Sequence, residues 1–284
     1  MTPAFDSRRV YDVWQKLISD EELYERLLED RHRELRDSRG LSEEDLAVLD
    51  DFRREPGLRW NIQNLRFRAA DHVKVVLQVY LPRTLYFLTK GEDGWLRDLV
   101  YEYVAYHRWH EYGRSYLTEC IRFARYVRER IAQRRRLPEI LDPVMALELA
   151  VVEVLRETAN VPPEAWQRGP APDDAALRAA RPRWGPAMKI IDLPVDFTEW
   201  IQTGDPSHGT VKEEPVALLI RVPSLEESHR VQRLSEGTRL LLERCTGSRT
   251  TAEIIAEVED ELGLEPAQVT NMIQRWLADG TLRV

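Results

Sequence analysis

The sequence predicts an α+β protein, with a helical N-terminal domain followed by a small C-terminal domain of strands and helices. Short runs of Val, Ile and Leu bounded by Pro, Gly and charged residues predict three strands, at Met188–Ile191, Val216–Val222 and His229–Leu234. Helical patterns follow at Glu236–Cys245, Thr251–Leu262 and Pro266–Asp279, before a stub of strand. This order is that of a winged helix with a three-stranded sheet, a scaffold that binds either DNA or an extended peptide.

The composition fits two domains with packed cores. The chain has 284 residues, 43% of them hydrophobic, and a net charge of −8. This charge argues against general nucleic-acid binding, although a local basic patch would still allow it. Cys120 and Cys245 lie in apolar helical patterns, which predicts buried, reduced thiols. The first twenty residues lack the apolar core of a signal peptide, and no run of about 18 apolar residues occurs, so we expect a cytoplasmic protein that enters no membrane.

The first 136 residues carry helical patterns almost throughout. Ser19 and Glu22 have the spacing of a capping box, in which each side chain satisfies the other residue's backbone N–H. Ser42 and Asp45 start a further helix in the same way. The dipeptide Pro56-Gly57 then breaks the helical pattern.

A long helix is predicted after this break. One stripe of it collects Leu65, His72, Val75, Val76 and Val79. His72 stands in a Val-rich stripe, which indicates a hydrogen-bonded core residue rather than a metal ligand. Pro82 ends or kinks this helix, because proline removes a helix hydrogen bond and clashes with the preceding turn.

Residues 101–136 form a basic segment on an acidic chain. They contain nine arginines and four glutamates, a net charge of +5. Arg122, Arg125 and Arg128 recur every three residues beside the apolar stripe of a predicted helix. Two interpretations remain open: a solvated helix face, or a docking face for an acidic partner surface.

A proline-rich stretch separates the two predicted domains. The last helical pattern before it is Val144–Leu155. Six prolines then follow, at a density that no helix interior tolerates: Pro162, Pro163, Pro170, Pro172, Pro182 and Pro186. We therefore expect a helical partner-docking domain over residues 1–160, a connector over 161–186, and a peptide-binding domain over 187–284.

Few residues are candidates for catalysis. The sequence contains no glycine-rich phosphate loop, no serine-hydrolase elbow and no cysteine pair with zinc spacing. His107 and His110 could place two imidazoles on one side of a helix, but a metal site needs further ligands. The tyrosines and tryptophan around them favour an aromatic helix packed into the core. We expect no catalytic residue, no metal and no cofactor in this chain, and a metalloenzyme built on this histidine pair ranks lowest.

The outward face of the last predicted helix gives weak support for DNA binding. A recognition helix presents polar and basic side chains to the major groove. Here the outward set contains a single cation and comprises Gln268, Thr270, Asn271, Gln274 and Arg275. An acidic segment, Glu257–Glu261, lies directly upstream.

Peptide binding fits the C-terminal domain better. An extended peptide could add to an exposed strand edge through backbone hydrogen bonds and place side chains in an adjacent groove. The candidate edge carries Arg230, Val231 and Arg233, whose charges suit an acidic peptide. The candidate groove on the last helix comprises Val269, Met272, Ile273 and Trp276. The alternative, that Met272 and Trp276 are core residues, is equally open at this point.

Two family resemblances follow from these residues. The run LSEGTRLLLERCTGSRTTAEIIAEVEDELGLEPAQVTNMIQRWLADGTLRV (Leu234–Val284) resembles PqqD-like domains, also called RiPP recognition elements. Upstream, VYLPRTLYFL and the segments Trp184–Ile201 and Arg221–Leu242 resemble the helical partner proteins of multinuclear non-haem iron oxidative enzymes. The segment Phe5–Phe52 is similar to the helical leader regions of some precursor peptides, and its role is left open.

These resemblances imply a non-catalytic subunit in ribosomal peptide natural product biosynthesis. Its C-terminal domain would bind the leader of a precursor peptide as an added strand. Its helical domain would dock, as in a heterodimer, on a barrel-fold enzyme that holds the iron. The alternative function is a winged-helix transcriptional regulator that binds DNA.

Overall fold

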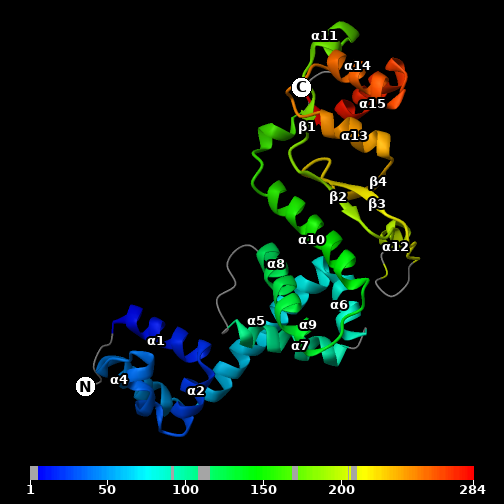
Figure 1. Cartoon of the computed structure of the whole chain (residues 1–284). Helices are drawn as coiled ribbons and strands as arrows, with labels where there is room; N and C mark the ends of the chain where they lie inside the picture. Colours follow the sequence, from blue (N-terminus) through cyan, green and yellow to red (C-terminus); the bar gives the residue numbers. More distant parts are fainter. Residues whose placement is uncertain (1–5, 91–92, 108–115, 168–171, 204, 206–209) are drawn as a thin grey trace. The chain divides into compact units, whose positions relative to one another are not determined.

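The computed structural model describes residues 6–90, 93–107, 116–167, 172–203, 205 and 210–284 (Figure 1). It is mixed helix and sheet, mostly helical with a small three-stranded antiparallel sheet, so the α+β class is confirmed. The chain divides into two compact units. Unit 1 comprises Met1–Val79 and Leu88–Arg134, and unit 2 comprises Tyr80–Phe87 and Arg135–Val284. Among the described residues, no helix is both long and apolar enough to cross a membrane.

Unit 1 is helical throughout its described part. Its helices are α1 (Ser7–Ser19), α2 (Glu21–Leu28), η1 (His32–Leu35), α3 (Arg36–Arg39), α4 (Glu43–Arg54), α5 (Leu58–Tyr80, whose last residue belongs to unit 2), α7 (Asp93–Tyr106), α8 (Tyr116–Tyr126), the π-helical η2 (Val127–Ile131) and α9 (Ala132–Arg134). The capping box of Ser42 and Asp45 starts α4 as predicted. The expected cap at Ser19 is wrong, because Ser19 ends α1 and the Asp20 side chain accepts the Leu23 N–H that opens α2.

The apolar stripe expected on the long helix is also wrong in part. On α5, Val76 is buried, but Leu65, Val75 and Val79 are exposed. His72 is exposed rather than a core residue, and its ring lies 4.7 Å from that of Tyr116 on α8. Unit 1 instead buries the opposite face of α5, which carries Ile62, Arg66, Ala70, Val73 and Leu77.

Unit 2 contains the sheet and the helices that cover it. Its elements are α6 (Pro82–Thr89, which crosses into unit 1 at Leu88), α10 (Leu141–Thr158), η3 (Pro163–Trp166), α11 (Asp174–Ala179), β1 (Arg183–Trp184), β2 (Met188–Leu193), α12 (Thr198–Thr203), β3 (Val216–Arg221), β4 (Arg230–Leu234), α13 (Glu236–Arg244), α14 (Thr251–Leu262), α15 (Pro266–Ala278) and β5 (Leu282–Arg283). Each predicted strand and helix of this part is present within a few residues of its expected bounds.

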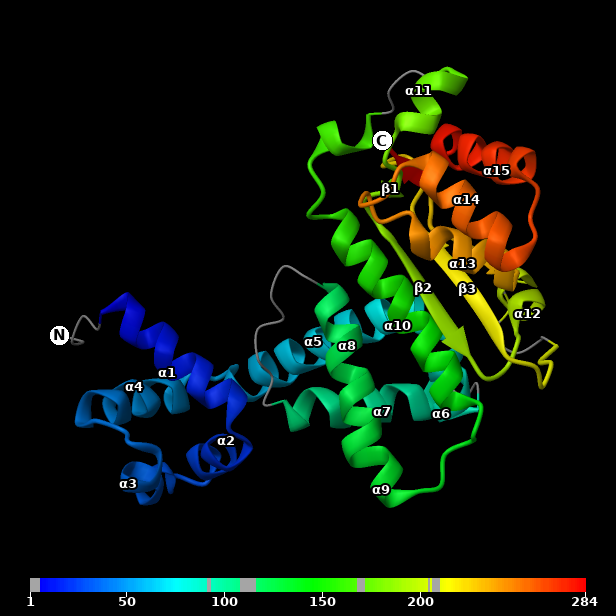
Figure 2. The same ribbon diagram turned by 45° about the horizontal axis from the view of Figure 1, so that its top comes forward.

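The sheet has the antiparallel order β2–β3–β4 and a helical layer on each face (Figure 2). Leu218 and Ile220 of β3 are fully buried with residues of α10 and α12. Leu219, one position out of phase, is buried among residues of α13, α14 and α15. This alternation follows from the period of two along a strand.

Much of the expected connector is part of unit 2. Leu177 of α11 is fully buried in the core of the three C-terminal helices. Trp184 of β1 pairs with Leu282 of β5 and donates its indole N–H to the Leu242 carbonyl at 2.8 Å. A Cβ on Gly185 would lie 2.5 Å from the Gly280 carbonyl oxygen, so this close approach requires glycine. Pro182 and Pro186 flank the short strand β1, and the expected boundary near residue 160 differs from the observed division.

A buried carboxylate holds α6 within unit 2. Glu148 of α10 is 5% exposed and accepts the backbone N–H groups of Arg83 and Thr84 at 2.8 and 3.0 Å. These donors lie in the first turn of α6, where helix N–H groups have no partner within the helix. The Arg83 guanidinium then donates to the carbonyl groups of Trp200 and Ile201 on α12 at 3.1 and 3.2 Å. The Glu148 carboxylate therefore joins α10 to α6, and the Arg83 guanidinium joins α6 to α12.

Glu148 should make stability fall as pH rises through neutrality. Burial raises the pKa of Glu148 to about 7, against the lowering effect of the N–H donors. Because the folded-state pKa exceeds the ordinary value of 4.5, the stabilising contribution is complete below about pH 4.5 and is lost as the pH rises to about 7. We expect a loss of about 2 kcal/mol in the free energy of unfolding between pH 5.5 and 8.5, relative to Glu148→Gln.

The measurement is urea unfolding followed by circular dichroism at pH 5.5, 7 and 8.5. Glu148→Gln retains one carbonyl acceptor and does not titrate, so its own defect should be the same at each pH. Equal pH dependence in both proteins would contradict the role assigned to Glu148.

Candidate functional site

The strand β4 is an edge of the sheet. It pairs with β3 from Ala217↔Leu234 to Arg221↔Arg230, and among the described residues no strand pairs with its other side. Arg230 and Arg233 are exposed, Val231 is half-buried and Leu234 is buried. An edge strand offers a row of backbone donors and acceptors to an added strand.

The side chains of β4 alternate between the two faces of the sheet. Val231 packs against the cluster that contains Leu218, Ile220 and Trp200, on the side of α10 and α12. Leu234 belongs to the cluster of α13, α14 and α15. A strand added to β4 would therefore expose its own alternate side chains to two different helical layers.

Both arginines on β4 have acidic partners within the protein. Arg233 donates to Asp196 at 2.8 Å and to Glu214 at 3.3 Å, and Arg230 pairs with Glu227. Burial tends to raise the pKa of Asp196, but hydrogen bonds from Thr198 and the charge of Arg233 hold it below its usual range. The expectation that these arginines favour an acidic peptide is weakened, because neighbouring carboxylates already offset their charges.

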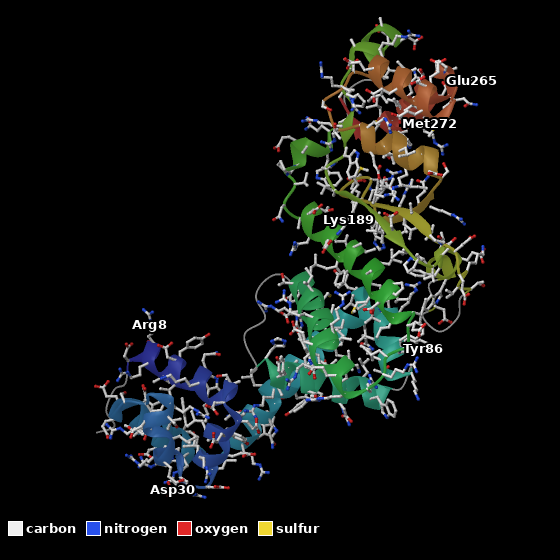
Figure 3. The ribbon with its side chains drawn as sticks, viewed as in Figure 1. Arg8, Asp30, Tyr86, Lys189, Glu265 and Met272 are labelled. Carbon is white, nitrogen blue, oxygen red and sulfur yellow. The ribbon has the colours of Figure 1, made fainter. Side chains whose placement is uncertain are left out.

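The four residues expected to line a groove on α15 are mostly core residues. Val269 and Ile273 are fully buried, and Trp276 is 8% exposed. Met272, labelled in Figure 3, is half-buried and packs against the same cluster. Of the four residues, only Met272 keeps substantial accessible surface, so only this side chain is available to line the expected groove.

The structure adds a pocket that the sequence analysis did not predict. It has a volume of about 820 Å³ and lies where β2 and β4 end and β3 and α13 begin. Its lining includes Asp192, Ala217, Leu234, Glu236 and Arg239. Arg239 pairs with Asp192 at 2.5 Å. These residues come from three separate segments, and only the pairing register of the strands brings them together.

The outward face of α15 offers one cation to a polyanion. Gln268, Asn271 and Arg275 are exposed. Thr270 bonds to the Pro266 carbonyl, and Gln274 lies 3.4 Å from the Asp174 carboxylate. This set gives little positive charge for contact with phosphates, which dominate the affinity of proteins for DNA.

The arginine series on α8 is not a uniform docking face. Arg122 donates to Glu119 at 2.7 Å, and Glu119 is 3% exposed and also accepts the Tyr103 hydroxyl at 2.9 Å. Arg125 and Arg128 are exposed. Arg128 lies in the π-helical turn η2, where the regular spacing of three residues no longer defines one face. Arg122 therefore has a structural role that its position in the series does not suggest.

The proposed histidine pair is described only in part. The His107 ring packs at 4.8 Å from Tyr103 and 5.0 Å from Tyr106, as expected for an aromatic helix. His110 lies outside the described residues. Within the described part of the chain, no group of three or more His, Cys, Asp or Glu side chains could hold a metal ion. Cys120 and Cys245 are buried free thiols, as predicted.

Comparison with known proteins gives no independent assignment. No protein-family model matches the sequence, and a search of curated proteins finds no match.

Reversing the charge of Arg122 should destabilise unit 1, whereas reversing Arg125 should not. Arg122→Glu would place a second carboxylate against buried Glu119, which costs on the order of 2 kcal/mol for a lost bond to a charged group. Arg125→Glu changes an exposed position and should shift stability by less than about 0.5 kcal/mol. Urea unfolding of the two variants is the measurement, and equal stabilities would contradict the structural role assigned to Arg122.

Proposed function

We propose that this chain is a non-catalytic accessory subunit in ribosomal peptide natural product biosynthesis. Residues 187–284 act as a winged-helix, PqqD-like recognition element for the leader of a precursor peptide. The observation that carries the proposal is the edge strand β4 of a three-stranded antiparallel sheet that is followed by three helices. The resemblance of Leu234–Val284 to RiPP recognition elements supports the same conclusion.

The leader binds by adding a strand to β4. Backbone hydrogen bonds supply affinity that depends little on sequence, and alternate side chains supply specificity. On one face, these side chains meet the layer that contains Leu234 and Met272. On the other face, they meet Val231 and the paired Arg233.

The second part of the proposal concerns the enzyme. Unit 1 docks on a barrel-fold, multinuclear iron oxidative enzyme, which holds the iron and modifies the peptide. The exposed Arg125 and Arg128 contribute charge to this contact, because opposite charge across an interface raises the association rate. The support here is the resemblance of the helical segments together with a basic helix on an acidic chain.

A pair of adjacent proline substitutions tests strand addition. Backbone N–H groups of neighbouring residues in a strand point to opposite sides, so either Val231 or Gln232 donates outward from β4. Val231→Pro and Gln232→Pro each remove one donor. One variant should lose pairing with β3 and some stability, and the other should stay folded and lose the peptide. The measurement is fluorescence anisotropy of a labelled leader peptide from the precursor encoded beside this chain, with thermal unfolding as the control. Wild-type affinity in the variant that stays folded would exclude the β4 edge.

A second substitution tests the helical side of the site. Met272→Glu places a charge at a half-buried apolar position, which costs a few kcal/mol if the peptide covers it. Asn271→Glu makes a similar charge change at the neighbouring exposed position. We expect the peptide affinity to fall about 30-fold in Met272→Glu and to change little in Asn271→Glu, with both variants folded by circular dichroism. Equal affinities would show that the peptide does not reach α15.

A further inference from the structure

Helix α5 carries apolar side chains on two opposite faces. Ile62, Val73 and Leu77 are at most 1% exposed and face the interior of unit 1. Trp60, Phe67, Val75 and Val79 are 66%, 58%, 52% and 62% exposed. At 100° per residue, these four lie within an arc of about 120° centred opposite the buried face. We call these four residues the α5 stripe.

The α5 stripe extends along almost the whole length of the helix. Nineteen positions separate its ends, which corresponds to about 29 Å along a helix axis. Isolated exposed apolar residues are normal on protein surfaces, whereas four large ones on one helix face, here separated by Asn64, Asp71 and Gln78, indicate a binding surface. Tryptophan and phenylalanine are also enriched at protein interfaces, and tryptophan is frequent among residues that dominate binding energy.

The charges along α5 indicate the chemistry of the partner. Arg68 and Lys74 lie beside the stripe, and the carboxylate of Asp71 lies between them on the same face. None of these three forms an ion pair with any residue in the described part of the chain. By contrast, the arginines of η1 and α3 pair with acidic neighbours, as Arg33 does with Asp50 and Arg39 with Asp20. With two cations and one carboxylate, this face of α5 has a net charge of +1 on a chain of net charge −8.

We propose that the α5 stripe is the docking surface for a protein partner with an apolar patch bordered by carboxylates. Resting on the proposed function, that partner is the iron-dependent enzyme of the complex. The stripe supplies the buried centre of the interface, and Arg68 and Lys74 supply its charged border. This surface is distinct from the β4 edge, since α5 up to Val79 belongs to unit 1 and β4 belongs to unit 2.

The experiment measures binding of the full chain to the purified iron-dependent enzyme encoded beside it, by biolayer interferometry. Trp60→Glu/Phe67→Glu should weaken binding by about 30-fold or more. Leu225→Glu, which changes a 53% exposed apolar residue in unit 2, serves as the matched control and should have little effect.

Arg68→Glu/Lys74→Glu should slow association and reduce its dependence on salt, whereas Arg136→Glu should not. All positions are exposed except Lys74, which is half-buried, and thermal unfolding checks that the variants remain folded.

Three outcomes would overturn the assignment. Wild-type affinity in Trp60→Glu/Phe67→Glu would exclude the stripe as the enzyme contact. A wild-type dimer in sedimentation velocity that this variant converts to monomer would assign the stripe to a second copy. Flotation of the wild-type chain, but not the variant, with phosphatidylserine-containing vesicles would assign it to a membrane. If the wild-type chain does not bind the enzyme, both this inference and the accessory role fail, while leader binding at β4 is decided separately by the anisotropy assay.

Discussion

The central strand β3 determines the architecture of unit 2. Leu218 and Ile220 are fully buried on one face, and Leu219 is 1% exposed on the other. Because each face of β3 is buried in a separate core, a shift of one residue in the strand pairing would move every side chain to the wrong layer. The register of β2 and β4 on β3 is therefore fixed, and β4 is placed at the edge. The candidate site depends on this constraint, because Val231 and Leu234 reach different helical layers only in this register.

Three buried or half-buried ion contacts then join segments that are far apart in the chain. Glu148 binds the first turn of α6, Arg221 of β3 pairs with Asp279 after α15 at 3.0 Å, and Arg233 of β4 pairs with Asp196. Removing one partner of such a contact leaves a charge in a poorly solvated site, which is more damaging than losing an exposed pair. Arg233 therefore belongs to the framework of the edge strand as well as to its surface. Charge-reversal experiments on β4 would report on folding and on peptide binding together, which is why backbone substitutions are the cleaner test.

The sequence was sufficient where one local pattern dominated. Strands β2, β3 and β4 alternate or are uniformly apolar between turn residues, and the capping box at Thr250 and the glycine at Gly263 bound α14. It was insufficient where burial depends on distant partners. The pattern on α5 contains two apolar faces, so periodicity alone could not select the one that unit 1 buries. In the sequence, Arg122 is one of a series of arginines. Only the tertiary structure shows that its side chain donates to the buried Glu119. The proline content of residues 161–186 suggested a linker because the signals of Leu177 and Trp184 are too short to define elements.

The two candidate surfaces differ in the kind of recognition that they support. The β4 edge offers backbone groups with arginines already neutralised, so it suits an extended chain whose affinity comes from hydrogen bonds. The α5 stripe offers large apolar side chains with a net positive charge beside them, so it suits a folded, acidic surface. They are also linked covalently, because α5 continues through Tyr80 to Pro82 and the first turn of α6, where Glu148 binds. Glu148 itself lies on α10, which packs on β2 and β3. A protein bound on α5 would therefore contact a helix whose next element, α6, is anchored to α10, which packs on the sheet that carries the β4 edge.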